Sequence, residues 1–132
     1  MGTLIDSSVL IAAERGRLDL EAGLAGRPDE PVGVAAITVS EVLHGTYRLG
    51  GVRLTRARAF VERWLTILPV VPFDLETARV HATLAADLGR RGTPMGAHDL
   101  MIAATAVQLG YAVATCDRRS FSRVDGLAVQ YW

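Results

Sequence analysis

Lysine is absent from this chain of 132 residues, and cysteine occurs only once, as Cys116. A single cysteine cannot form an internal disulfide or a cysteine-rich zinc site, so the chain is expected in a reducing, cytoplasmic environment. The missing lysine also excludes P-loop nucleotide hydrolases, whose lysine contacts phosphoryl groups. Response-regulator receivers and haloacid-dehalogenase-like phosphatases are excluded in the same way.

Net charge and membrane-spanning runs are lacking as well. Fourteen arginines balance 14 acidic residues, so bulk charge gives no indication of nucleic-acid binding. The longest apolar run, residues 100–116, contains Gln108 and Gly110 and is bounded by Asp99 and Asp117. A helix followed by a strand is therefore favoured over a membrane span. With no leader pattern and 50% hydrophobic residues, we expect one globular domain over residues 1–132, with no membrane contact.

Short apolar runs alternate with stretches of helical periodicity along the whole chain. Strands are predicted at residues 3–5, 32–37, 69–73, 111–115 and 127–131. Helices are predicted at residues 7–14, 18–25, from 38 or 40 to 47, 54–68, 75–90 and 97–109. Since the strands are almost wholly apolar, the pattern is typical of an α/β fold, a parallel β-sheet flanked by helices on both faces.

Four acidic residues occupy related places in this order of elements. Asp6 and Asp117 each follow a strand directly. Glu41 lies in the first turns of the helix after the second strand, and Asp99 lies in the first turn of the helix that leads to the strand before Asp117. Because right-handed crossovers bring the carboxyl ends of parallel strands to one edge, we expect all four at that edge.

Each acid also has an ordinary interpretation, as a helix cap, a first-turn acid, a turn residue or a solvated helix residue. Taken together they favour a metal site, because four carboxylates in one crevice repel one another unless a cation binds. Mg²⁺ or Mn²⁺ suits such oxygen ligands and can activate water for attack on a phosphodiester. His98 is interpreted as a loop residue near the site and not as a ligand.

Four segments carry a family resemblance: Leu4–Ile11, Ser40–Gly45, His98–Ala106 and Thr115–Phe121. In this order they resemble the signatures of PIN-domain nucleases, and in particular the VapC toxins of type II toxin–antitoxin pairs. The match extends from Leu4 to the C-terminal strand, and the segment that contains Asp99 is the most specific.

The resemblance implies a PIN-like fold and an endoribonuclease that cleaves tRNA, rRNA or mRNA by metal-activated water attack. It implies Asp6 and Asp99 as the principal metal ligands, with Asp117 bound directly or through water. Glu41 would complete the catalytic set by holding a metal-bound water or a second ion, and Thr115 would position the Asp117 loop or contact phosphate. The implied partners are a VapB-type antitoxin and a second copy of the chain in a homodimer.

Two questions stay open at the level of sequence. Arg118 and Arg119 follow Asp117 and are candidates to bind the RNA backbone, but a solvated turn in an arginine-rich chain fits equally well. The alternative to an enzyme is a catalytically silent PIN-like module that binds RNA or protein. Apolar residues of the early helices could receive an antitoxin helix, or belong to the core or a dimer interface: Leu18, Leu20, Leu24, Trp64 and Leu65.

Overall fold

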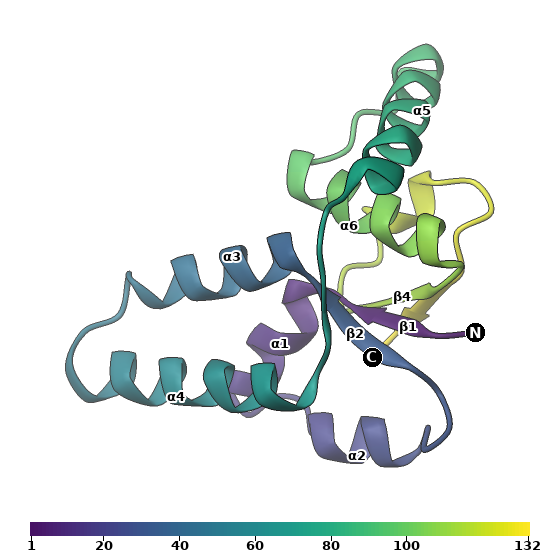
Figure 1. Cartoon of the computed structure of the whole chain (residues 1–132). Coiled ribbons are helices and arrows are strands. Elements are labelled where there is room, and N and C mark those ends of the chain that lie inside the picture. The colour runs from purple at the N-terminus through teal and green to yellow at the C-terminus, as the bar shows by residue number, and fades with distance from the viewer.

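The computed structural model describes residues 1–132 and contains one five-stranded sheet of order β3-β2-β1-β4-β5, in which every pair is parallel (Figure 1). The strands are β1 Thr3–Ile5, β2 Val32–Ala35, β3 Val70–Val71, β4 Ala112–Thr115 and β5 Val129–Tyr131. The helices are α1 Ser7–Glu14, α2 Leu20–Ala25, α3 Ala36–Thr46, α4 Gly51–Ile67, α5 Leu75–Arg91 and α6 Ala97–Leu109, with a 3₁₀ turn, η1, at Phe121–Arg123.

Two apolar cores cover the two faces of the sheet, as the apolar strands predicted. Alternate residues of β1 point to opposite faces, so that Ile5 belongs to a core with α1, α2, α3 and α4, and Leu4 belongs to a core with α6. Helix α5 stacks on α6 and not on the sheet (Figure 1). The predicted α/β class and helices on both faces are confirmed. No helix has both the length and the apolar character needed to cross a bilayer.

The apolar residues of the early helices belong to the first of these cores. Leu20 and Trp64 are buried in it, and Leu18, Leu24 and Leu65 pack against it. Of the readings that the sequence left open for these five side chains, the structure favours the core.

Several boundaries differ from those predicted: α4 begins at Gly51 and not at residue 54, and the junction between β2 and α3 lies earlier than expected. The second strand was predicted to extend to residue 37, with a cap at Thr38 or Ser40, but β2 ends at Ala35 and α3 begins at Ala36 without a side-chain cap. Small apolar residues at the end of a buried strand cannot be distinguished from the first turn of a buried helix by periodicity alone. The consequence is that Glu41 lies in the second turn of α3.

The reversal of strand order occurs around β1. From β1 the chain moves outward through β2 to β3 on one side, and it returns through α5 and α6 to β4 and β5 on the other. The carboxyl ends of β1 and β4 are therefore neighbours, with Ile5 opposite Ala114. Ligand sites of open parallel sheets lie at such a point.

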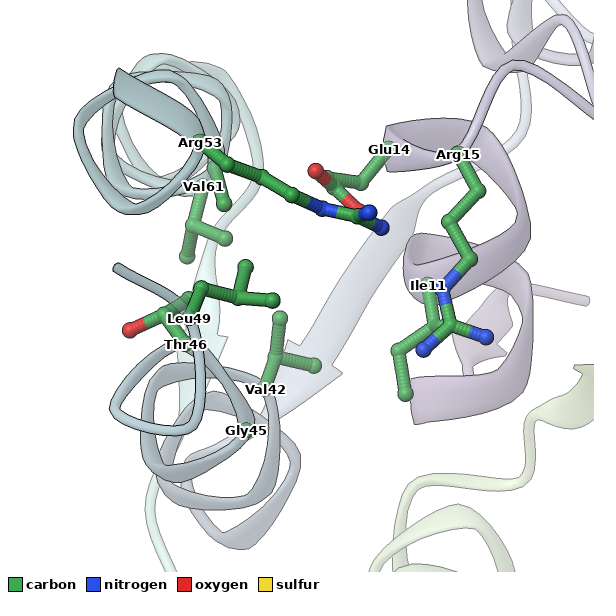
Figure 2. A pocket seen from close by; sticks show the side chains of 10 residues that line it. Ile11, Glu14, Arg15, Val42, Gly45, Thr46, Leu49, Arg53 and Val61 are labelled. Carbon is green, nitrogen blue, oxygen red and sulfur yellow. The ribbon is translucent and has the colours of Figure 1, made fainter. Parts of the chain in front are cut away.

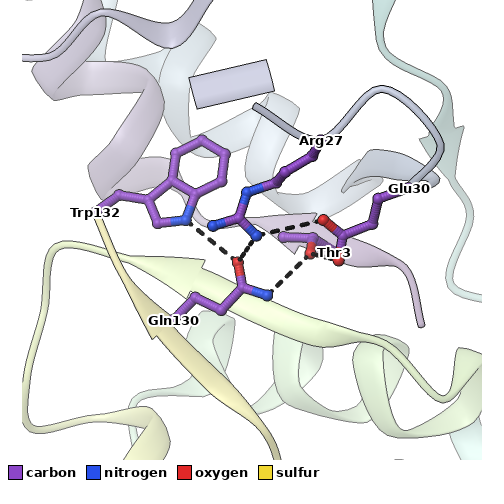
Figure 3. A network of polar contacts seen from close by, with 5 residues as sticks. All are labelled: Thr3, Arg27, Glu30, Gln130 and Trp132. Atoms are coloured by element: carbon purple, nitrogen blue, oxygen red, sulfur yellow. Dashed lines mark hydrogen bonds and ion pairs between the residues drawn. The ribbon is translucent and has the colours of Figure 1, made fainter. Parts of the chain in front are cut away.

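The C-terminal strand is held by a polar network on the face covered by α1 and α2 (Figure 3). The Arg27 guanidinium donates to Gln130 Oε1 at 2.6 Å and lies 5.0 Å from the centre of the Trp132 ring. Thr3 Oγ1 donates to Glu30 Oε1 at 2.9 Å, which joins β1 to the segment before β2. The network ties the final residues of the chain to two earlier segments.

Gly33 marks a close approach between β2 and the edge strand. A Cβ at this position would lie 3.0 Å from the Pro69 carbonyl oxygen, which accepts the Val34 N–H. We expect Gly33→Ala to lower the free energy of unfolding by about 1 kcal/mol, because backbone must move to admit the methyl group.

Gly89 of α5 provides the matched control, since a Cβ there would meet nothing within 4 Å. Gly89→Ala should raise the free energy of unfolding by about 0.5–1 kcal/mol through helix propensity. Urea unfolding of both variants measures the difference, and two changes of the same sign would contradict the packing at Gly33.

Candidate active site

Asp6 is a buried carboxylate directly after β1. Only 3% of its surface is exposed, and its Oδ2 accepts hydrogen bonds from Ser8 Oγ at 2.7 Å and from Thr115 Oγ1 at 2.9 Å. A hydroxyl has one proton to donate, so both hydroxyls direct theirs to the same carboxylate oxygen. The sheet and the start of α1 thus hold Asp6 in one orientation.

The same two hydroxyls also anchor the loop after β4. The N–H of Cys116 donates to Ser8 Oγ and the N–H of Asp117 donates to Thr115 Oγ1, each at 3.0 Å. Thr115 therefore contacts both the Asp6 carboxylate and the backbone of the Asp117 loop. Ser8 was not among the predicted site residues. Its place two residues after Asp6, in the first turn of a predicted helix, could have indicated that its hydroxyl lies near that carboxylate.

Asp99 and Glu41 come from the first turn of α6 and the second turn of α3. Ser120 Oγ, itself buried, donates to Asp99 Oδ2 at 2.6 Å. Glu41 Oε2 lies 3.3 Å from His98 Nδ1, while Glu41 Oε1 is buried without a hydrogen-bond partner. His98 is thus a helix residue in contact with Glu41 and not the loop residue that the sequence suggested.

The carboxylates are close enough to affect one another. Burial, reinforced by the charges of Asp6 and Asp117, raises the pKa of Asp99 above its ordinary value, although the Ser120 hydrogen bond opposes the change. Burial also raises the pKa of Glu41, with contributions from Asp6 and Asp99, against the opposing effect of His98. All four predicted acids thus lie within one electrostatic environment.

Asp117 differs from the other three acids because it is exposed. Its Oδ1 accepts the Arg119 N–H at 2.8 Å, so it also shapes the turn in which it lies.

The arginines after Asp117 are held away from the acids. Arg118, one of the two arginines predicted to bind RNA, stacks on Tyr131, with its guanidinium carbon 4.6 Å from the ring centre. Arg123 donates to the Pro94 carbonyl at 2.8 Å. None of these arginines forms an ion pair with a carboxylate of the site.

The residues present fit a hard cation. An open depression lies over the site, lined by Glu41, Gly96, Ala97, His98 and Asp99. No three acidic, histidine or cysteine side chains come close enough together to enclose an ion. Mg²⁺ nevertheless binds through one or two carboxylates and keeps several waters. Glu41 Oε1 has no hydrogen-bond partner, and no arginine pairs with Asp6, Glu41, Asp99 or Asp117, so these oxygens are not neutralised by a cationic side chain other than His98.

A parallel sheet with acidic side chains gathered at its chain reversal defines the class: an open α/β domain with a polar site at the point where the strand order reverses. Comparison with known proteins identifies the family within this class. The chain belongs to the PIN-domain family, whose model matches residues 3–127, and within that family to the VapC proteins. Nucleases of this family generally depend on a divalent metal ion. The predicted family is confirmed, whereas the roles of individual side chains remain predictions.

Two curated relatives and one solved structure illustrate the similarity. Ribonuclease VapC1 of Rickettsia felis is 31% identical over 98% of this chain and 95% of its own length. The tRNA(fMet)-specific endonuclease VapC of Salmonella typhimurium is 32% identical over 75% of this chain and 74% of its own. A DNA-bound VapBC structure from Salmonella typhimurium matches with a TM-score of 0.89 and 26% identity, over 100% of this chain and 98% of the other.

The raised pKa of Asp99 predicts a stability that falls with increasing pH. The folded state holds the Asp99 proton more tightly than the unfolded chain, so ionisation between the ordinary and the raised pKa destabilises the fold. In EDTA, Asp99→Asn should be more stable than the native protein at neutral pH, and the difference should shrink toward pH of about 3.9, where an ordinary aspartate is half protonated.

Urea unfolding at the two pH values measures this effect. Asp125→Asn is the control, because the Asp125 side chain is 85% exposed and its one ion-pair partner is Arg91, 3.9 Å away, so its stability change should not vary in this way. An Asp99→Asn variant that is less stable at neutral pH would contradict the prediction.

Proposed function

We propose that this chain is a divalent-metal-dependent endoribonuclease and the toxin of a type II toxin–antitoxin pair. The observation that carries the proposal is the group of carboxylates at the reversal of strand order, with raised pKa values and no paired arginine. The relatives named ribonuclease VapC1 and tRNA(fMet)-specific endonuclease VapC support the same activity. A tRNA is accordingly the first RNA to test.

In this proposal Asp6 and Asp99 hold a Mg²⁺ or Mn²⁺ ion, and Asp117 binds it directly or through water. Such an ion, when bound, supplies positive charge beside the scissile phosphate and lowers the pKa of water. Asp6 is well suited to a ligand role, because Ser8 and Thr115 fix its orientation and donate to its charged form. Ser120 does the same for Asp99.

Glu41 is proposed as the group that receives a proton from the attacking water. Its raised pKa brings it nearer to the operating pH, which favours a general base. His98 Nδ1 lies 3.3 Å from its Oε2, while its Oε1 is buried and has no hydrogen-bond partner. Thr115 serves as a positioning residue, since it orients both Asp6 and the Asp117 loop.

The proposed partner is a VapB-type antitoxin, which is supported by the solved VapBC complexes that the chain resembles. A small hollow between α1, α3 and α4 offers a place for an apolar side chain of such a partner (Figure 2). Val42 and Val61 line it together with the charged residues Glu14 and Arg53. A homodimer is proposed from the family, and the cytoplasm from the RNA substrate and the single cysteine.

Cleavage of RNA is the direct test. Purified protein incubated with total bacterial RNA and Mg²⁺ should produce new 5′ ends at defined positions. Asp99→Asn and Glu41→Gln should each reduce the rate by about 100-fold or more, because the first removes a proposed metal ligand and the second removes the proposed proton acceptor. Glu62→Gln, an exposed acid of α4, is the matched control and should cleave normally. RNA binding without cleavage by the native protein would favour the silent module instead.

Metal binding has a readout that does not depend on cleavage. Mg²⁺ or Mn²⁺ at about 100 times its Kd should stabilise the native protein by about 2.7 kcal/mol, because the ion binds only the folded state. The melting temperature should therefore rise on metal addition and return to its first value in EDTA. In Asp99→Asn the rise should be largely lost, and an equal rise in that variant would exclude Asp99 as a ligand.

A further inference from the structure

Tyr131 is a half-exposed aromatic residue at the same edge of the sheet as the acids. It ends β5, pairs in register with Thr115 of β4, and has 40% of its surface exposed. Parallel neighbours in register point to the same face, so Asp6, Thr115 and Tyr131 form a row across three strands. With strands about 4.8 Å apart, the backbone of Tyr131 lies roughly 10 Å from that of Asp6.

The orientation of Tyr131 is fixed from both faces of the sheet. Val129 packs against the α6 core on one face. Gln130 and Trp132 enter the network with Arg27 on the other face (Figure 3). Because side chains alternate along a strand, Tyr131 must face the α6 side, where Asp99 also lies.

Arg118 covers the ring of Tyr131 directly beside the site. Its guanidinium carbon is 4.6 Å from the ring centre, and the residue follows Asp117 in the chain. Arg118 is exposed and forms no ion pair, so this stack is its only polar or aromatic partner. The result is a solvent-exposed pair of one aromatic ring and one planar cation, at the end of the row formed by Asp6, Thr115 and Tyr131.

We propose that Arg118 and Tyr131 form a stacking platform for an unpaired base of the RNA, next to the phosphate that is cleaved. Unpaired bases stack on aromatic rings and on guanidinium planes, and such stacking tolerates any base because each has a π-face. In this arrangement the planar guanidinium of Arg118 stacks on the base, in addition to attracting the RNA through its charge. A contact with phosphate alone would use only the charge. This inference rests on the proposed nuclease function and names the nucleotide contact that accompanies it.

The chain contains a second arginine–tyrosine stack that serves as an internal control. The Arg58 guanidinium carbon lies 4.3 Å from the centre of the Tyr47 ring, between α4 and the far end of α3. Tyr47 is 69% exposed, so the pair has the same chemistry and more accessible surface. This pair does not belong to the row formed by Asp6, Thr115 and Tyr131. Any general effect of an arginine–tyrosine pair on RNA binding should therefore appear at both pairs.

The test separates base contacts from phosphate contacts. In an Asp99→Asn background, fluorescence anisotropy gives the Kd of a mixed-sequence 12-nucleotide single-stranded RNA and of a fully abasic 12-mer with the same number of phosphates. Because one stacked base is worth about 1–3 kcal/mol, the abasic probe should bind roughly tenfold more weakly. In Tyr131→Leu and Arg118→Lys this ratio should fall toward one, whereas Tyr131→Phe should keep it.

Matched variants of the second stack, Tyr47→Leu and Arg58→Lys, should leave the ratio as in the parent. If Tyr131→Leu fails to fold, Arg118→Lys, which changes an exposed loop residue, decides the outcome. An unchanged ratio in both Arg118→Lys and Tyr131→Leu, or equal binding of the two probes by the parent, would overturn the platform. RNA cleavage by the native protein is measured in a separate experiment. The binding data can therefore contradict the stacking platform while the proposed nuclease function still holds.

Discussion

The Thr115 hydroxyl donates its proton to Asp6 across the junction of β4 and β1, and this hydrogen bond supports the rest of the site. Together with Ser8 it fixes the orientation of a carboxylate that is almost wholly buried. Burial raises the pKa of both Asp99 and Glu41, and the charge of Asp6 adds to the change in each. The position of Asp6, which Thr115 and Ser8 hold, therefore affects acids on two other helices.

Buried carboxylates cost stability, and the surrounding sheet offsets that cost. The strands on either side of the chain reversal are lined by fully buried aliphatic residues on both faces. In the proposed function, a cation that binds only the folded state would add to the stability of the protein. Stability and metal binding would then be coupled through the same oxygens.

Much of this could be predicted from sequence because the signals are local. Apolar runs predicted the five strands, and helical periodicity predicted α5 and α6 to within a residue at each end. The neighbouring positions of Asp6 and Asp117 followed from the general rule for parallel sheets. Contacts between distant segments could not be predicted from sequence, such as the hydrogen bond from Ser120 to Asp99 and the contact of His98 with Glu41. The start of α3 at Ala36 was also missed, because a buried strand and a buried helix turn have similar apolar residues.

The arginines near the site show how the chain keeps charge of both signs at one edge without cancelling it. Arg118 rests on Tyr131 and Arg123 is held by the Pro94 carbonyl, so neither guanidinium reaches a carboxylate. If either paired with Asp99, it would neutralise the charge on which a metal ion depends. Held apart, the acids remain available to a cation while the arginines remain available to RNA. The aromatic ring that restrains Arg118 therefore contributes to both halves of the proposed site.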